Sequence, residues 1–454
     1  MSSITKTTMT STAAKGVPGA SGAAGAGRHY SFQPLNIGRI LIWGAFALAL
    51  IVAPLVFTSS LALTMLSQIG YLIIICLSYN ILLGQGGMLS FGHAVYTGLG
   101  SFIAIHAMNR ASSGDWGIPL VLIPIIGGLG GMFFAALLGY VTTKKSGTTF
   151  AMITMGIGEL VASMALMFPE FFGGEGGITT NRVYGAKILG WDFGPQMQVY
   201  YLIAVYCFLC TSLMFAFTGT PLGRMLNAVR DNPERVEFIG YSTRHIRYFA
   251  FIISGFFAGI GGGLAAINFE IVTAADSVSV VRSGGYLLFT FLGGATFFFG
   301  PIIGAVLLVL ASVLLSELTK AWLLYLGIAF LIMVMYAPGG IASLVMLNLR
   351  MARYGRLKPL LPHYAALLVA VAIAVVGGAA MVEMLYHLQL NAAVGPQLHY
   401  MGMTLQADQP TPWVVSGVLF AGGAALFEWA RRRFARAWDA AQESVEKQSR
   451  GGAA

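Results

Sequence analysis

The sequence predicts an all-α polytopic membrane protein with about twelve transmembrane helices, each of roughly 20 apolar residues. Of its 454 residues, 57% are hydrophobic and only 9% are charged, and the mean hydropathy is +0.77. Soluble domains carry about 25% charged residues, so this composition excludes soluble enzymes and nucleic-acid-binding proteins. Residues 40–109 contain no Asp, Glu, Lys or Arg, which leaves room for about three crossings.

The predicted spans follow the charge-poor stretches in chain order. They are 40–58, 61–82, 89–108, 118–141, 148–168, 197–218, 248–268, 285–299, 301–318, 321–340, 364–386 and 411–430. The spans 285–299 and 301–318 are divided only by Gly300 and Pro301.

The distribution of basic residues predicts that both termini are cytoplasmic. Of 26 Lys and Arg residues, the outer loops of this arrangement hold only Arg110, Arg182, Lys187, Arg282 and Lys320. Cytoplasmic loops of membrane proteins carry an excess of Lys and Arg, so topology explains the net charge of +9. A lipid bilayer is the expected surrounding, and no nucleic-acid partner is expected.

Composition divides the chain into four parts. Residues 1–38 are rich in Ser, Thr, Ala and Gly and are predicted to form a disordered cytoplasmic tail. Residues 39–345 form the main transmembrane domain, and residues 346–430 combine a basic linker with two extra transmembrane helices. Residues 431–454 form a basic cytoplasmic tail.

Two glycine-rich segments, 82–98 and 291–305, interrupt the apolar sequence. Non-helical backbone at membrane depth is tolerated only beside protein or a water-filled cavity. Paired interrupted segments in a transporter point to its translocation site, although each glycine alone could equally serve helix packing. The candidate path residues are Gly84, Gly87, Ser90, Gly92, His93, Gly293, Gly294, Gly300 and Pro301.

Three polar side chains in these spans have alternative interpretations. Ser90 and His93 either hydrogen-bond to a neighbouring helix, which we favour, or line the path. Glu159 lies near the middle of its span, where a carboxylate costs roughly 2.5 to 3.5 kcal/mol on insertion scales. It is therefore also a path candidate, with hydrogen bonding to a neighbouring helix as an equal alternative.

The basic segment 218–249 is the clearest surface for a cytoplasmic partner. Thr220 and Pro221 suit the cap and first turn of a helix, and a second short helix after Pro233 is expected to end at Gly240. An apolar stripe at helical spacing is formed by Leu222, Met225, Leu226 and Val229. The segment could lie on lipid headgroups or dock in a groove of a cytoplasmic protein, and we favour docking because acidic residues interrupt its bases.

The chain has no G-x-x-x-x-G-K-[ST] loop for phosphates, no H-E-x-x-H and no cluster of metal ligands. We therefore expect a transport subunit rather than an enzyme, with no metal and no cofactor bound by this chain. Active transport would then need energy from a partner or from an ion gradient.

In combination, these motifs resemble those of the LivM-type permease subunits of branched-chain amino-acid ABC importers, in the LivH/LivM permease family. The resemblance covers residues 60 to 345. The matched residues are Gly84, Gly87, Ser90, Phe91, Gly92, His93, Ala94, Phe150, Ala151, Thr154, Gly158, Glu159, Gly173, Gly174, Gly177, Ile178, Gly223, Arg224, Ala228, Val229, Arg230, Asp231, Asn232, Glu237, Gly240, Leu292, Gly293, Gly294, Gly300, Pro301, Gly304, Ala305, Pro338, Gly340 and Ile341.

By this resemblance, loop 219–247 corresponds to the coupling segment that receives the movement of an ATPase. Its matched residues include Gly223, Arg224, Arg230, Asp231, Glu237 and Gly240. The resemblance implies an inner-membrane ABC importer permease that works with a second, LivH-like permease, two cytoplasmic P-loop ATPase subunits that use ATP, and a periplasmic substrate-binding protein. Branched-chain or other apolar amino acids are the implied substrates, although similar permeases carry urea, amides and small aromatic acids. The C-terminal extension, from residue 355 onward, lies outside the resemblance.

Two other classes of protein stay open on the residues alone. One is a stand-alone secondary transporter or channel with Glu159 as its ion or proton site. The other is a membrane-embedded assembly or sensor subunit that transports nothing.

Overall fold

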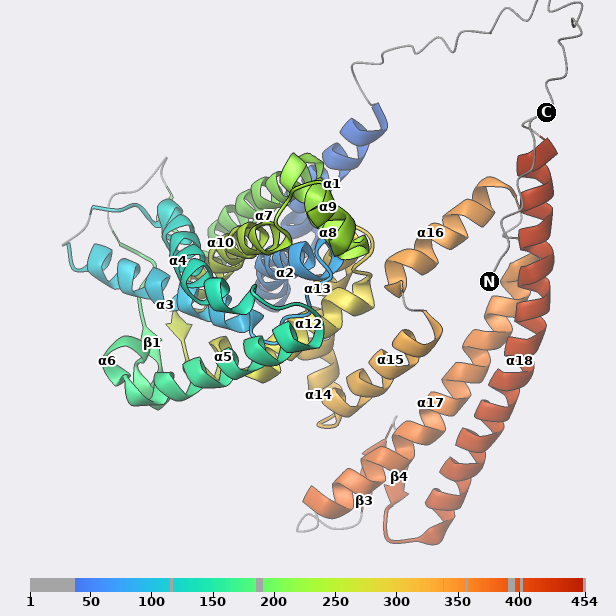
Figure 1. Cartoon of the computed structure of the whole chain (residues 1–454). Helices are drawn as coiled ribbons and strands as arrows, with labels where there is room; N and C mark the ends of the chain where they lie inside the picture. The colour runs from blue at the N-terminus through green and yellow to red at the C-terminus, as the bar shows by residue number, and fades with distance from the viewer. Residues whose placement is uncertain are drawn as a thin grey trace, which may run out of the picture. The chain divides into compact units, whose positions relative to one another are not determined.

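The computed structural model describes residues 37–114, 117–184, 191–337, 339–355, 358–390, 397–400 and 403–451. Helices make up nearly all of its regular structure (Figure 1). They are α1 (Ile37–Val56), α2 (Ser60–Asn80), α3 (His93–Ser112), α4 (Ile123–Thr142), α5 (Gly147–Met167), α6 (Pro169–Phe172), α7 (Gln196–Gly219), α8 (Pro221–Asp231), α9 (Pro233–Phe238), α10 (Thr243–Phe269), α11 (Ala274–Ser277), α12 (Val280–Gly293), α13 (Gly300–Leu310), α14 (Ser316–Leu318), α15 (Trp322–Tyr336), α16 (Gly340–Arg353), α17 (Leu361–Leu390) and α18 (Pro410–Gly451).

Eight helical segments of the described chain are long and apolar enough to cross a membrane. They are Ser60–Gln85, Leu120–Thr142, Gly147–Met167, Gln196–Gly219, Thr243–Phe269, Gly300–Leu318, Leu361–Gln389 and Pro410–Ala440. The pair α15 and α16, bent by 50°, would make a ninth. The chain is thus an all-α, multi-pass membrane protein, as predicted.

The predicted count of twelve spans is not confirmed. The other four predicted spans fall on α1, α3, α12 and α15. α12 and α15 have 14 and 15 residues, which is short of the roughly 20 that a straight crossing needs. α1 is a shorter apolar helix, and α3 is less apolar because His, Thr, Ser and Asn interrupt it.

The chain divides into two units, residues 1–46 and 47–454. Of the first unit, the described part is the beginning of α1. Most of the predicted disordered tail, 1–38, lies outside the described residues, and only its last two residues are described, as the start of α1. The predicted division into domains stays a prediction.

Within the second unit, α10 is the central helix and packs against α2, α3 and α4. Its contact with α4 depends on glycines of both helices. A Cβ atom at Gly259 would overlap the carbonyl oxygen of Gly127, and one at Gly255 would lie 3.0 Å from the carbonyl oxygen of Gly131. The backbones can therefore approach closely, which favours association of helices in lipid, where no hydrophobic effect drives it.

The loops that follow α6 and α10 are joined by a short antiparallel ladder. Its strands are β1 (Ile178–Thr179) and β2 (Ile271–Val272). Arg182 strengthens this junction, because its backbone N–H donates to the Glu270 carboxylate at 2.9 Å and its guanidinium donates to the carbonyl oxygens of Phe193 and Gly194, both at 2.9 Å.

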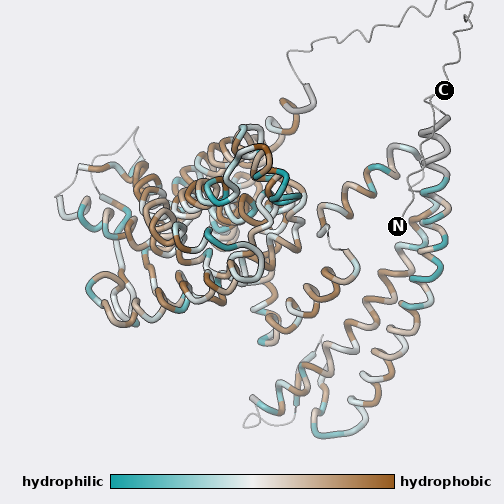
Figure 2. Tube along the Cα trace, viewed as in Figure 1, coloured by the Kyte–Doolittle hydropathy of each residue, from teal (hydrophilic) through white to brown (hydrophobic). Residues whose placement is uncertain are grey.

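The C-terminal extension is a helical hairpin of α17 and α18. At the turn, β3 (Gln397–Tyr400) and β4 (Met403–Gln406) pair antiparallel. Figure 2 shows hydrophobic colour along α17 and the adjoining part of α18, and more hydrophilic colour towards the C-terminal end of α18. The predicted tail from 431 continues α18 without a break, because residues 424–450 contain no Gly or Pro and many strong helix formers. Part of the predicted basic linker is likewise helical, in α16.

Candidate translocation and coupling site

The first glycine-rich segment breaks the helix that α2 begins. After Asn80 the chain makes a π-helical turn, Ile81–Gln85, and α3 starts only at His93. We call residues 81–92 the first break. At Gly87 φ is +62° and a Cβ atom would lie 2.8 Å from Cγ of Arg230, so conformation and space both require glycine. π-Helical turns are frequent at functional sites.

The second glycine-rich segment separates α12 from α13. α12 ends at Gly293, Gly294 has φ +117°, and α13 starts at Gly300 with Pro301 in its first turn. We call residues 294–299 the second break. A Cβ atom at Gly293 or at Gly300 would overlap the backbone across this break, so the two helix ends pack directly on each other.

The two breaks meet at Gly84. A Cβ atom there would overlap the carbonyl oxygen of Ala295 in the second break and the side chain of Asn80. Segments about two hundred residues apart in sequence are therefore in direct backbone contact. Such a meeting of interrupted helices is the arrangement that transporter sites use.

Ser90 and His93 are fully buried, and their surroundings are packed. The Nε2 atom of His93 lies 2.9 Å from Oγ of Ser78, and its ring stands edge-on to that of Tyr79, with centroids 4.9 Å apart. The Tyr79 hydroxyl donates to the Ser90 carbonyl oxygen at 2.8 Å. In this conformation both residues lie in helix packing rather than in an open channel.

α5 holds the far end of the first break. Thr154 Oγ1 accepts the backbone N–H of Phe91 at 3.1 Å, and a Cβ atom at Gly92 would overlap the Thr154 carbonyl oxygen. Gly158 lies on the same side, since a Cβ atom there would be 3.9 Å from Cα of Gly92.

Glu159 is not brought to the breaks. Its side chain is exposed on α5 and makes no hydrogen bond or ion pair within the described part of the chain. Residues on the same exposed side include Met152, Met155, Gly156 and Ser163. Of the predicted path residues, only Glu159 thus points away from the body of this chain.

The basic loop forms two short helices, α8 and α9, with the predicted caps. Thr220 Oγ1 accepts the backbone N–H of Gly223 at 3.2 Å, and Pro221 opens α8. α9 ends before Gly240, which has φ +88° and donates its N–H to the Glu237 carbonyl oxygen at 2.9 Å. This glycine-terminated turn is a common way to end a helix.

α8 is hydrogen-bonded to the first break. Asn227 Nδ2 donates to Gln85 Oε1 at 2.8 Å, and Arg230 Nη1 donates to the carbonyl oxygen of Gly84. Arg230 also pairs with Asp231, its Nη2 atom 3.0 Å from Oδ1. The carbonyl at the end of a helix lacks an intrahelical donor, and Arg230 supplies one.

The remaining predicted coupling residues have simpler placements. Gly223 packs tightly on the end of α7, at Phe217, and Arg224 is exposed. Glu237 accepts a hydrogen bond from the Thr243 hydroxyl at 2.8 Å. At the end of α9 and just after it, the loop exposes three large apolar side chains, with Phe238 88% exposed and Ile239 and Tyr241 also exposed.

Sequence reasoning missed several residues of this site. Ser78 and Tyr79 lie just before the first glycine-rich segment and Gln85 lies inside it, but a polar residue in an apolar helix does not reveal its partner by itself. No signal in the sequence links Asn227 to Gln85, because 142 positions separate them.

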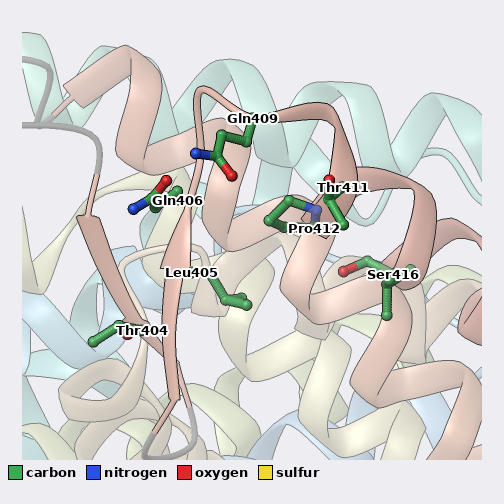
Figure 3. Close-up of a pocket in the computed structure, with 8 residues that line it drawn as sticks. Thr404, Leu405, Gln406, Gln409, Thr411, Pro412 and Ser416 are labelled. Carbon is green, nitrogen blue, oxygen red and sulfur yellow. The ribbon is translucent and has the colours of Figure 1, made fainter.

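A hollow of about 570 Å³ lies in the extension, between β4 and the start of α18. Figure 3 shows its uncharged lining, with Gln406, Gln409, Thr411 and Ser416 among the labelled side chains. None of the predicted site residues lines it. Within the described residues, no three His, Cys, Asp or Glu side chains are grouped to hold a metal ion.

Comparisons with known proteins match most of the chain before α16. The family model described as branched-chain amino acid transport system / permease component matches residues 61–337. The high-affinity branched-chain amino acid transport system permease protein LivM of Escherichia coli (strain K12) is 28% identical over 300 residues, which cover 62% of this chain and 69% of that protein. The corresponding Salmonella typhimurium LivM is 27% identical over 303 residues, with the same coverage of 62% and 69%.

A more distant relative is the probable branched-chain amino acid transport permease protein LivM of Methanocaldococcus jannaschii. It is 24% identical over 324 residues, which cover 60% of this chain and 90% of that protein. No solved structure matches the chain. The family match ends before α16 and the extension.

Proposed function

Because the chain belongs to the family of permease components of branched-chain amino acid transport systems, we propose that it is the membrane subunit of an ATP-driven ABC importer. It carries branched-chain or other apolar amino acids inward across the bacterial inner membrane, with both termini cytoplasmic. One observation carries this proposal beyond the family: the cytoplasmic helix α8 is bonded to the first break through Asn227 and Arg230.

These bonds give the loop a way to act on the breaks. A displacement of α8 pulls on Gln85 and on the Gly84 carbonyl, both in the π-helical turn. Gly84 also touches Ala295, so the same displacement reaches the second break. Small shifts of packed helices are a common way to convert a local movement into a change of state.

The exposed side of α5 fits a second permease. An unpaired carboxylate facing lipid is expensive, and charged residues in membrane spans almost always face protein or water. Small residues such as Gly156 and Ser163 favour close helix contact, and the nearby methionines adapt to varied partners. We place a LivH-like permease on this side, with Glu159 at the path between the subunits, where it can pair with the ammonium group of a substrate.

Two ATPase subunits and a periplasmic substrate-binding protein complete the proposed importer. Phe238, Ile239 and Tyr241 are exposed on the cytoplasmic loop and suit a groove on an ATPase. The ATPases bind and hydrolyse ATP, so this chain itself is no enzyme and holds no cofactor. The binding protein selects the substrate and delivers it from outside.

To test this proposal, the chain is purified together with its co-purifying subunits and reconstituted into liposomes. Valine uptake is then measured with the binding protein outside and ATP inside the liposomes. Asn227→Leu should lower ATP-driven uptake by about 3- to 10-fold, because one hydrogen bond contributes about 1 kcal/mol, without loss of the co-purifying subunits. Asn109→Leu is the matched control, since the Asn109 side chain, near the end of α3, donates a hydrogen bond to the Thr179 carbonyl oxygen of β1 instead.

Unchanged uptake by Asn227→Leu would contradict the proposed role of α8. Uptake by this chain alone, driven by an ion gradient and lost in Glu159→Gln, would favour a secondary transporter. Uptake of urea, an amide or an aromatic acid in place of valine would show that the chain transports a different substrate class, while its family would stay the same.

A further inference from the structure

A second hollow, of about 280 Å³, lies where the C-terminal extension meets the permease core. The core contributes α14 and the turn between α14 and α15, and the extension contributes the end of α17 and one residue of β3. Its charged and polar lining includes Glu317, Thr319, Lys320, Glu383, Tyr386 and His387. The family match covers the first three of these residues and excludes the α17 residues, so the family does not account for this site.

Glu383 is the side chain around which the hollow is organised. It lies inside the candidate span Leu361–Gln389, where ionisable residues are rare and mark functional sites. Its Oε1 atom accepts hydrogen bonds from the Thr319 hydroxyl and from the Tyr325 hydroxyl, the latter at 3.2 Å. Its Oε2 atom makes no hydrogen bond within the described residues. Two donors from the core thus fix the carboxylate and leave one oxygen for a ligand.

The charges of the lining select the chemistry of that ligand. Two carboxylates, Glu317 and Glu383, and one ammonium, Lys320, surround the hollow. Glu317 and Lys320 are exposed, and Glu383 is half-buried. An apolar ligand would remove water from these groups without replacing it by a partner, and an anion would face two carboxylates. A metal ion is disfavoured because the described chain groups no three suitable ligands. A compact molecule with both an ammonium and a carboxylate group satisfies all three charges.

We propose that this hollow binds a small zwitterionic amino acid, at a site separate from the two glycine breaks. The volume lies just below the range typical of drug-sized ligands, about 300–1,000 Å³, which suits a ligand of this size. By the predicted orientation, the turn of Lys320 and the hairpin of β3 and β4 are on the outer side, so the site samples amino acids outside the cell. Residues of the extension and residues of the core both line the site.

The test is equilibrium dialysis of the full chain in lipid nanodiscs, together with its co-purifying subunits but without binding protein or nucleotide. The probes are valine, valinamide as the cation and isovalerate as the anion. Valine should bind best, and Glu383→Gln and Lys320→Met should each weaken it by about tenfold or more, because each removes a charge-assisted hydrogen bond. Lys320→Met tests the proposal even if Glu383→Gln loosens the extension.

One further variant separates this site from other acidic groups. Asp408→Asn changes an exposed carboxylate that does not line the hollow, and it should bind valine as the unmodified chain does. Valine binding that survives Glu383→Gln and Lys320→Met, or that Asp408→Asn abolishes, overturns the proposal, as does valinamide binding equal to that of valine. Because no ATP is involved, failed ATP-driven uptake would leave this result standing.

Discussion

α4 and α5 follow each other in the chain and have 20 and 21 residues, yet their exposed faces differ. α4 exposes Leu129, Phe133 and Leu137, which lipid tails accept without cost. α5 exposes Glu159, Gly156 and Ser163 among methionines, which lipid does not accept equally well. The contrast supports the proposal that this chain meets lipid at α4 and a second permease at α5.

We expect the largest difference between the two faces when a new carboxylate is placed on each of them. Phe133→Asp places a charge in lipid at a cost of about 2.5 to 3.5 kcal/mol, which corresponds to roughly 60- to 400-fold less inserted chain. Met155→Asp, at similar depth on α5, should lower insertion by no more than about threefold, because protein or water covers that face. Quantitative glycosylation mapping of the inserted fraction measures both, and equal losses would remove the distinction between the two faces.

Removing the native Glu159 carboxylate from α5 also compares the two faces, and its expected effect is smaller. If α5 faced lipid, Glu159→Leu would raise the inserted amount, since a costly charge would be gone. We expect unchanged insertion instead, together with a roughly tenfold loss of valine uptake, because the path loses its charged partner. Glu159→Asp is the conservative control and should keep most of the uptake. A rise in insertion with normal uptake contradicts the account.

The membrane character and most helices could be predicted from the sequence, because charge-free stretches and glycine breaks are local features. The number of spans could not, since α12 and α15 are too short to cross alone, and apolar composition does not reveal helix length. The caps of α8 and α9 were predictable because Thr220, Pro221 and Gly240 act on their own neighbours.

Tertiary contacts of the site were beyond sequence reasoning. The glycine clusters predicted two breaks, but their meeting at Gly84 and Ala295 depends on how α2, α12 and α13 pack. The direction of Glu159 likewise follows from which side of α5 carries Thr154 and Gly158, the residues that touch the first break. The roles of the predicted path and coupling residues stay predictions.

The most direct measurement is photo-crosslinking in native membranes, with a photoreactive amino acid at Met155 or at Phe133 and identification of the products by mass. We predict that position 155 captures a second permease of the same family and that position 133 captures only lipid. Capture of lipid alone at both positions would contradict the claim that α5 is the contact face of an importer complex.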